Sequence, residues 1–260
     1  MSGTTPKGIT DERLASAWVR GMFGQVAGHY DLLNHVLSFN LDRWWRARTV
    51  RRVAPVLADP RARVLDLCCG TGDLMLGLEA RRGAAVIGAD FCHPMLVEAK
   101  RKVSARAGRS ILFEGDALEL PLAGGVLDLV TCAFGFRNFV NYEAGLVELA
   151  RVLKPGGTLA ILEFSQPDNR LFAGLYDWFS LRVLPRVGGL ISGSSDAYSY
   201  LPASIRKFPD AAGLAEKMRG AGFQDVEFER MTFGVVALHI GRKKETRPAE
   251  ARLTEEHPNR

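Results

Sequence analysis

The sequence predicts an α/β protein built on a doubly wound, mostly parallel sheet. Short apolar runs typical of buried strands alternate with helical patterns, and the first of these runs ends in a glycine-rich turn. In such a sheet, ligands bind at the carboxyl ends of the strands. We expect strands over residues 63–68, 85–90, 110–114, 126–133 and 158–163, and helices over residues 72–82, 94–106 and 142–152.

The glycine-rich turn is Gly70-Thr71-Gly72, and it follows an apolar run that begins at Val64. Glycine has no Cβ, so a ligand can approach the backbone closely there. Asp90 ends the next expected strand, at the position from which a carboxylate reaches the ribose of a bound nucleoside. The pattern therefore predicts a nucleoside-bearing cofactor. A glycine-rich turn that binds no ligand is the alternative.

The turn differs from a dinucleotide-binding turn. Such a turn carries a third glycine three residues after the second, whereas Asp73-Leu74-Met75 follows Gly72 here. The carboxylate of Asp73 would also lie close to a phosphate. S-adenosylmethionine has an adenosine and a cationic sulfonium but no phosphate, so it fits better. Residues 64–72 resemble motif I of the class I S-adenosylmethionine-dependent methyltransferases, which implies a Rossmann-like fold.

Helical periodicity before the first strand covers residues 11–30 and 41–58 and predicts an N-terminal helical extension over residues 11–58. One face of its first helix is expected to carry Leu14, Trp18, Met22 and Val26.

The pattern changes after the fifth expected strand. Residues 166–204 are strongly apolar but are interrupted by prolines and glycines. We interpret them as a lid insertion over an apolar substrate, with ordinary core packing as the alternative. A turn is expected over residues 154–157, and a helix over 210–221 followed by a hairpin of strands over 223–230 and 233–242 is expected to close the sheet.

Residues 1–243 are predicted to form a single domain, with a loose polar start over residues 1–10, and residues 244–260 a disordered tail. The chain has no apolar signal core and no run of 18 apolar residues, so we expect a cytoplasmic protein. Peripheral contact with the inner face of the membrane stays open, and so does the oligomeric state.

The net charge of +5 includes a cluster of arginines interleaved with tryptophans over residues 43–52. Contact with nucleic acid, contact with an anionic membrane and a solvated helix face are the three interpretations. No Asn-Pro-Pro-Tyr-type motif follows the fourth expected strand, so a nucleic-acid partner is not expected.

The cysteines do not predict a metal site. No histidine or cysteine pair has the spacing of zinc ligands. Small buried side chains near the cofactor are the preferred interpretation of the four cysteines, which are Cys68, Cys69, Cys92 and Cys132.

Two longer segments, residues 30–45 and 151–165, resemble the two signatures of the ubiquinone/menaquinone biosynthesis C-methyltransferase family. The likeness extends over residues 20–243, with departures at Leu33, Asp42 and Ala133. It implies methylation, with S-adenosylmethionine, of a ring carbon of a polyprenylated quinol. Cys68-Cys69 and residues 165–167 look more like members that convert demethylmenaquinol to menaquinol. The corresponding benzoquinol of the ubiquinone pathway, and a non-catalytic cofactor-binding scaffold, are the alternatives.

The resemblance also implies roles for individual residues. The residues expected to bind the cofactor are Gly70, Thr71, Asp90, Asp116 and Ala117. Those expected to take part in catalysis are Arg137, Asn138 and Tyr30. An arginine stays protonated, so Arg137 is expected to stabilise a phenolate rather than to act as the base. The alternatives are a structural ion pair for Arg137 and packing in the helical cap for Tyr30.

Overall fold

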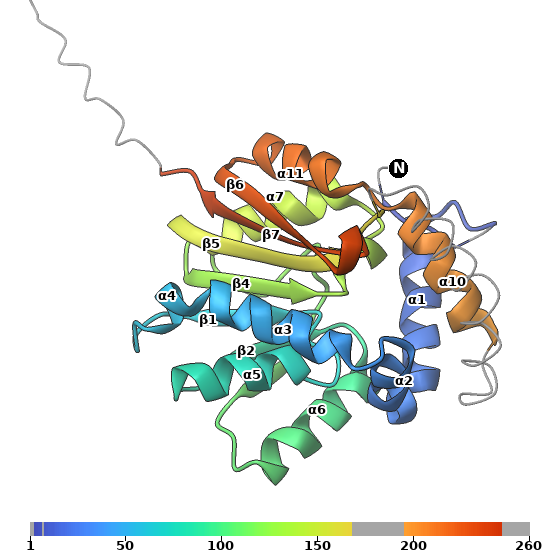
Figure 1. The fold of residues 1–260 in the computed structure, drawn as a ribbon, viewed down its shortest axis with the longest axis horizontal. Coiled ribbons are helices and arrows are strands. Elements are labelled where there is room, and N and C mark those ends of the chain that lie inside the picture. The colour runs from blue at the N-terminus through green and yellow to red at the C-terminus, as the bar shows by residue number, and fades with distance from the viewer. Residues whose placement is uncertain (1–2, 7, 168–194, 246–260) are drawn as a thin grey trace, which may run out of the picture.

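The computed structural model describes residues 3–6, 8–167 and 195–245. They form a seven-stranded sheet of order β3-β2-β1-β4-β5-β7-β6, in which the first five strands are parallel and β7 is antiparallel to both of its neighbours (Figure 1). The strands are β1 (Val64–Leu67), β2 (Ile87–Asp90), β3 (Ile111–Glu114), β4 (Leu127–Ala133), β5 (Leu153–Phe164), β6 (Phe223–Met231) and β7 (Val236–Lys243).

Helices precede the sheet and connect its strands. They are α1 (Glu12–Val26), α2 (Tyr30–Leu37), α3 (Leu41–Arg52), α4 (Ala54–Leu57), α5 (Asp73–Arg82), α6 (His93–Ala105), α7 (Tyr142–Val152), α10 (Ser195–Lys207) and α11 (Ala211–Gly220), with the short 3-10 turns η1 (Ala27–His29), η2 (Phe136–Asn138) and η4 (Thr232–Gly234). Three of these helices begin after a polar N-cap residue. In α1, α7 and α11, a backbone amide of the first turn donates a hydrogen bond to the side chain of Asp11, Asn141 and Asp210, respectively.

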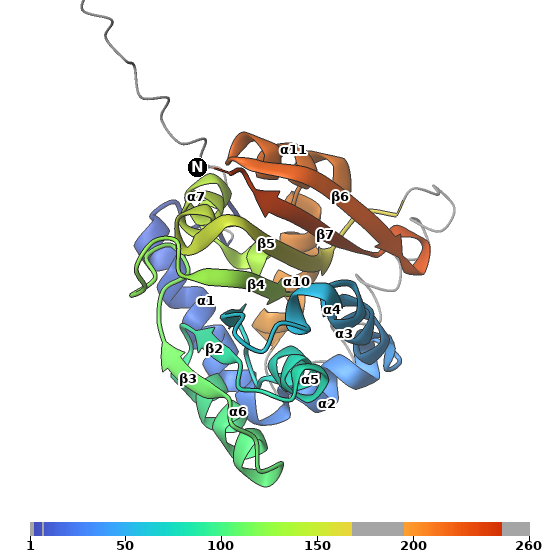
Figure 2. The same ribbon diagram turned by 90° about the vertical axis from the view of Figure 1, so that its left-hand side faces the viewer.

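The core consists of two apolar layers, one on each face of the sheet. Val64 and Leu162 lie in the layer that α3, α4 and α5 cover, whereas Leu65 and Ile161 lie in the layer beneath α7 and α11. Neighbouring residues of one strand thus belong to opposite layers, as the pleat of a strand requires. Figure 2 shows the strands side by side, with helices packed on both faces. The doubly wound fold predicted from the sequence is confirmed.

The prediction of a turn over residues 154–157 is wrong, because these residues lie inside β5. Leu127 pairs with Leu153 and Leu129 with Thr158, so β5 accommodates extra residues opposite β4. Such an irregularity lets a strand continue through a proline and two glycines.

Two expectations for the N-terminal region are also wrong. Leu14 is 64% exposed, and the buried face of α1 carries Ala15 and Val19 together with Met22 and Val26. Thr4, in the segment expected to be loose, is buried, and its amide donates a hydrogen bond to the carbonyl of Phe139 (3.1 Å).

Two arginines of the α3 cluster form ion pairs within the protein. Arg48 donates to both carboxylate oxygens of Glu229 (2.8 and 3.1 Å), and Arg52 pairs with Glu227 and Glu229. These pairs join α3 to the edge strand β6. Most of the predicted lid (residues 168–194) and most of the predicted tail (residues 246–260) lie outside the described residues; from the lid range the structure describes residues 166–167 and the first part of α10.

Candidate cofactor and substrate site

The glycine-rich turn joins β1 to α5 at the carboxyl edge of the sheet. Its backbone is left-handed at Cys68, Gly70 and Gly72, with φ of 52°, 53° and 87°. A Cβ at Gly72 would lie 3.1 Å from Cε of Met75 and 3.4 Å from the Cβ of Ala99, so glycine there lets α5 and α6 pack closely. The sequence thus folds into the open turn that the pattern predicts.

Asp90 fixes this turn from the end of β2. Its Oδ2 accepts a hydrogen bond from the amide of Gly70 (2.8 Å), and its Oδ1 accepts one from the amide of Cys92 (2.9 Å). The carboxylate is buried, and burial raises the pKa of Asp90 while the backbone donors oppose that rise. Each oxygen retains a lone pair, so the group can accept further hydrogen bonds from a ligand.

A cavity opens beside this turn. Of the predicted site residues, six line it, namely Tyr30, Gly70, Asp90, Asp116, Ala117 and Asn138. Glycine is required at its wall, because a Cβ at Gly135 would lie 2.3 Å from the Cβ of Cys68. The cavity therefore gathers residues from the ends of four parallel strands and from α1 and α2.

The charges of the lining favour a cation. Asp90 and Asp116 contribute carboxylates, and no lysine or arginine is found among the described lining residues. Asp116 is held in place because its Oδ1 accepts a hydrogen bond from the amide of Leu118 (2.9 Å). A ligand with a pyrophosphate would face two carboxylates without a counter-charge, whereas a sulfonium ligand without phosphates fits.

Thr71 does not line the cavity. Its hydroxyl donates to Oδ1 of Asp31 (2.5 Å) and accepts from Nζ of Lys102 (3.1 Å). Lys102 also pairs with Asp31 and Asp73, each at 2.6 Å. The structure thus places Thr71 in a network that ties α2 to the glycine-rich turn.

Arg137 is not among the lining residues either. It is 5% exposed, and its Nη1 donates to Oε1 of Glu163 (3.2 Å) and to the carbonyl oxygen of Phe134. Glu163 is equally buried and also accepts from the backbone amide of Arg137 (3.1 Å). This is the ion pair that the sequence left open as the alternative for Arg137. The Nε of Arg137 has no hydrogen-bond partner among the described residues.

Tyr30 and Asn138 do reach the cavity. Tyr30 begins α2 and packs edge-on against Phe23, with ring centroids 6.0 Å apart. Burial raises the pKa of Tyr30, and the charge of Arg137 partly offsets that rise. Asn138 ends η2, and its buried Oδ1 has no partner among the described residues. Both side chains can therefore address a ligand.

Two buried carboxylates were not singled out from the sequence. Asp66 lies in β1 and accepts from Oγ1 of Thr131 (2.6 Å), and burial raises its pKa to about 7. Glu163 lies in β5 opposite Arg137. In both cases the signal is a single carboxylate inside an apolar strand, which must find a polar partner when the strand is buried.

Among the described residues, one group could bring metal-ligating atoms together. Atoms of His35, Asp42 and Asp73 lie within 4.8 Å of one another. Arg46 pairs with Asp42, and Lys102 with Asp73. The two cations already neutralise these carboxylates, which makes the group a poor site for a metal ion.

Comparison with known proteins agrees with the geometry. Residues 9–243 match the ubiE/COQ5 methyltransferase family. A demethylmenaquinone methyltransferase of Thermus thermophilus is 50% identical over 85% of this chain and 99% of its own length. One from Deinococcus radiodurans is 44% identical over 91% and 97%, and a ubiquinone/menaquinone biosynthesis C-methyltransferase of Syntrophotalea carbinolica is 44% identical over 85% and 92%.

Solved structures share the fold at low identity. An S-adenosylmethionine-dependent methyltransferase of Thermotoga maritima, titled a possible histamine N-methyltransferase, superposes with a TM-score of 0.62 at 18% identity, over 86% of this chain and 99% of that one. A Haemonchus contortus phosphoethanolamine N-methyltransferase solved with S-adenosylmethionine gives 0.55 at 15% identity, over 75% and 53%. The fold is that of the class I methyltransferases, and the chain belongs to the ubiE/COQ5 methyltransferase family.

Proposed function

We propose that this protein uses S-adenosylmethionine to methylate a ring carbon of a polyprenylated quinol, converting demethylmenaquinol to menaquinol. The observation that carries the proposal is the single cavity lined by Asp90 and Asp116 together with Tyr30 and Asn138. The names of relatives at 44–50% identity support the naphthoquinol substrate. Membership of a methyltransferase family favours an enzyme over a non-catalytic scaffold.

On the cofactor side, Gly70, Asp90, Asp116 and Ala117 would hold S-adenosylmethionine, which supplies an electrophilic methyl group when bound. Asp90 has lone pairs free to accept from ribose hydroxyls. Thr71 serves the site by holding the turn against α2, through Asp31 and Lys102.

On the substrate side, Tyr30 and Asn138 orient the ring and Arg137 stabilises negative charge on the ring oxygen. A quinol carbon attacks a methyl group well only when its ring oxygen has given up its proton. Arg137 stays protonated and its Nε–H is free of described partners, so it can donate but cannot take that proton. The base is therefore a separate group, for which a water molecule suffices.

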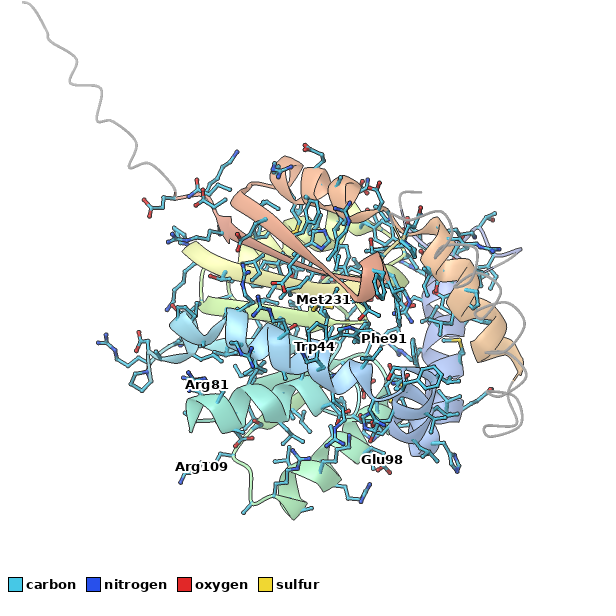
Figure 3. All side chains as sticks on the ribbon, viewed as in Figure 1. Trp44, Arg81, Phe91, Glu98, Arg109 and Met231 are labelled. Atoms are coloured by element: carbon cyan, nitrogen blue, oxygen red, sulfur yellow. The ribbon has the colours of Figure 1, made fainter. Side chains whose placement is uncertain are left out.

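The protein also contacts the membrane peripherally, through an exposed apolar face on α2 and α3. The exposed apolar side chains of these two helices, which we call the α2–α3 apolar face, are Leu32, Val36, Leu41 and Trp44. Trp44 is labelled in Figure 3. Arg43, the exposed chain neighbour of Trp44, suits an anionic lipid surface. Tyr30, which begins α2, lines the cavity, so the helix that carries Leu32 and Val36 also contributes to the cavity wall. None of the helices in the described part of the chain is long and apolar enough to cross a membrane.

The experiment that tests the substrate assignment is a competition between two quinols. Demethylmenaquinol and the corresponding ubiquinone-pathway benzoquinol are offered together with S-adenosylmethionine, under reducing conditions in detergent. We expect the methylated naphthoquinol to accumulate first. A preference for the benzoquinol would reassign the substrate, and cofactor binding without methylation of either would favour a scaffold.

A further inference from the structure

Several buried polar atoms around the Arg137–Glu163 ion pair have no hydrogen-bond partner among the described residues. They are Nε of Arg137, Oδ1 of Asn138, Oγ of Ser165 and the hydroxyl of Tyr200. Arg137, Ser165 and Tyr200 are each at most 6% exposed. Buried polar groups are nearly always hydrogen-bonded, so a group of four in one region needs an explanation.

The four atoms come from three segments that meet at the ion pair. Arg137 and Asn138 are neighbours in η2, and Glu163 binds Arg137 from the end of β5. Ser165 follows β5 directly, two residues after Glu163, and its amide donates to the carbonyl of Val235 (2.8 Å). Helix α10, which carries Tyr200, packs against η2.

Tyr200 interacts with the charges of this ion pair and packs beside residues of the cavity wall. Its ring packs against Trp18, with centroids 5.3 Å apart, and belongs to an apolar cluster with Phe23 and Phe91. Phe23 and Phe91 both line the cavity. Burial raises the pKa of Tyr200 to about 12, and the charge of Arg137 opposes that rise. The phenol is therefore a neutral donor at neutral pH.

The chemistry of the four atoms indicates an oxygen ligand with negative charge. The guanidinium N–H can only donate, and the two hydroxyls can donate, whereas Asn138 alone offers only an acceptor at its free atom. Donors that converge on an oxygen favour its anionic form. A phenolate oxygen on an aromatic ring has this chemistry, and Asn138 connects the group to the cavity.

We propose that Tyr200 and Ser165 bind the ring oxygen of the quinol together with Arg137, and so determine the ionisation of the substrate. This inference rests on the proposed function and adds two substrate-binding residues to it. Ordered water that fills the same positions and plays only a structural part is the competing explanation.

The test uses full-length Tyr200→Phe, Ser165→Ala and the double variant, with purified demethylmenaquinol of short prenyl length as the probe. Affinity for S-adenosylmethionine is measured by calorimetry and is expected to equal that of the wild type. The value of kcat/KM is expected to fall roughly tenfold or more for each variant, as for the loss of a hydrogen bond to a charged group. The pH at half-maximal rate is expected to rise, because the bound phenol loses a donor that favours its ionised form.

Tyr142→Phe is the matched control. Tyr142 is a buried tyrosine beside the same residues, but its hydroxyl already donates to the carbonyl of Arg137 (3.1 Å) and contacts Thr4. This variant is expected to lower thermal stability without moving the pH profile.

The inference is overturned if both Tyr200→Phe and Ser165→Ala keep the kcat/KM and pH profile of an active wild type. It is also overturned if Tyr142→Phe shifts the pH profile equally. If Tyr200→Phe fails to fold, the result for Ser165→Ala, which removes only a hydroxyl group, decides whether the inference stands. A wild type that binds S-adenosylmethionine but methylates no quinol would contradict the proposed function itself, and this inference with it.

Discussion

Asp90 combines two tasks at the scale of a single residue. Its oxygens accept hydrogen bonds from the amides of Gly70 and Cys92, and its side chain also lines the cavity. An alanine at this position would remove both hydrogen bonds to the turn, whereas asparagine can keep one of them and so disturbs the turn less.

Asp90→Asn is expected to weaken S-adenosylmethionine binding roughly tenfold to a hundredfold, while the protein stays folded. Asparagine keeps one acceptor but loses the charge and the second acceptor, and hydrogen bonds to a charged group contribute about 1.5–3 kcal/mol. Calorimetric titration measures the affinity. Glu98→Gln is the control, because Glu98 lies on α6 outside the cavity lining (Figure 3). Equal affinities for Asp90→Asn and the wild type would remove Asp90 from the cofactor site.

Arg137→Met is expected to destabilise the protein strongly, because it leaves the carboxylate of Glu163 buried without a partner. Breaking a buried ion pair from one side typically costs about 3–5 kcal/mol. Arg137→Met combined with Glu163→Gln should recover part of that loss. Urea denaturation gives the free energies of unfolding. Arg101→Met, which breaks an exposed pair with Glu98, should cost less than about 1 kcal/mol, and a similar cost at both arginines would contradict this account.

His239 predicts a dependence of stability on pH. Its Nε2 donates to the carbonyl of Ala211 (2.8 Å), whereas Nδ1 is buried without a described partner, and burial lowers the pKa of His239 from 6.5 to about 4. The unfolded chain therefore binds a proton that the folded chain refuses between pH 6.5 and 4. His239 thus costs stability as the pH falls through that window, by about 3 kcal/mol in total. Between pH 7 and pH 5, the free energy of unfolding should fall less for His239→Gln than for the wild type. Equal falls in the two proteins would contradict the lowered pKa of His239.

At the scale of elements, most of the parallel strands of the sheet were predicted from the sequence. An apolar run with turn residues at both ends specifies a strand such as β1 or β4 through local composition alone. The extension of β5 through residues 154–157 could not be predicted, because it depends on pairing with β4. The buried face of α1 was misjudged at Leu14 for a similar reason, since only the partner elements α6 and α10 decide which side is covered.

The candidate site was predicted only in part. Asp90 and Gly70 follow from the order of strands in the fold, and the structure brings them into one cavity. Glu163, which pairs with Arg137, and Tyr200, which we propose as a substrate-binding residue, come from β5 and α10. The sequence pattern does not show that these two elements pack against η2. Pairing of Arg137 with a carboxylate was foreseen as an alternative, but the partner was not.

The α2–α3 apolar face leads to a prediction about membrane binding. The variant Leu32→Ser combined with Trp44→Ser is expected to reduce co-sedimentation with anionic vesicles roughly tenfold, because each side chain no longer buries apolar area in lipid. The control is Val97→Ser with Val147→Ser, which changes equally exposed apolar residues on α6 and α7. An identical loss in the control would mean that vesicle binding does not depend on this face.

At the scale of the whole molecule, the N-terminal helices complete a site that the sheet alone leaves open. α1 and α2 contribute Phe23 and Tyr30 to the cavity, and the contacts of Asp31 with Thr71 and Lys102 hold α2 against the turn. In the proposed function, one molecule would hold the cofactor at the strand ends, the quinol ring beside α10 and the lipid that carries the substrate against the α2–α3 apolar face.

The most direct test of this account is a reaction of the purified wild type with demethylmenaquinol and S-adenosylmethionine carrying a labelled methyl group. Mass spectrometry and nuclear magnetic resonance identify the product. The account predicts menaquinol with the label on a ring carbon and both ring hydroxyls free. A label on a ring oxygen, or no transfer by a protein that binds the cofactor, would contradict it.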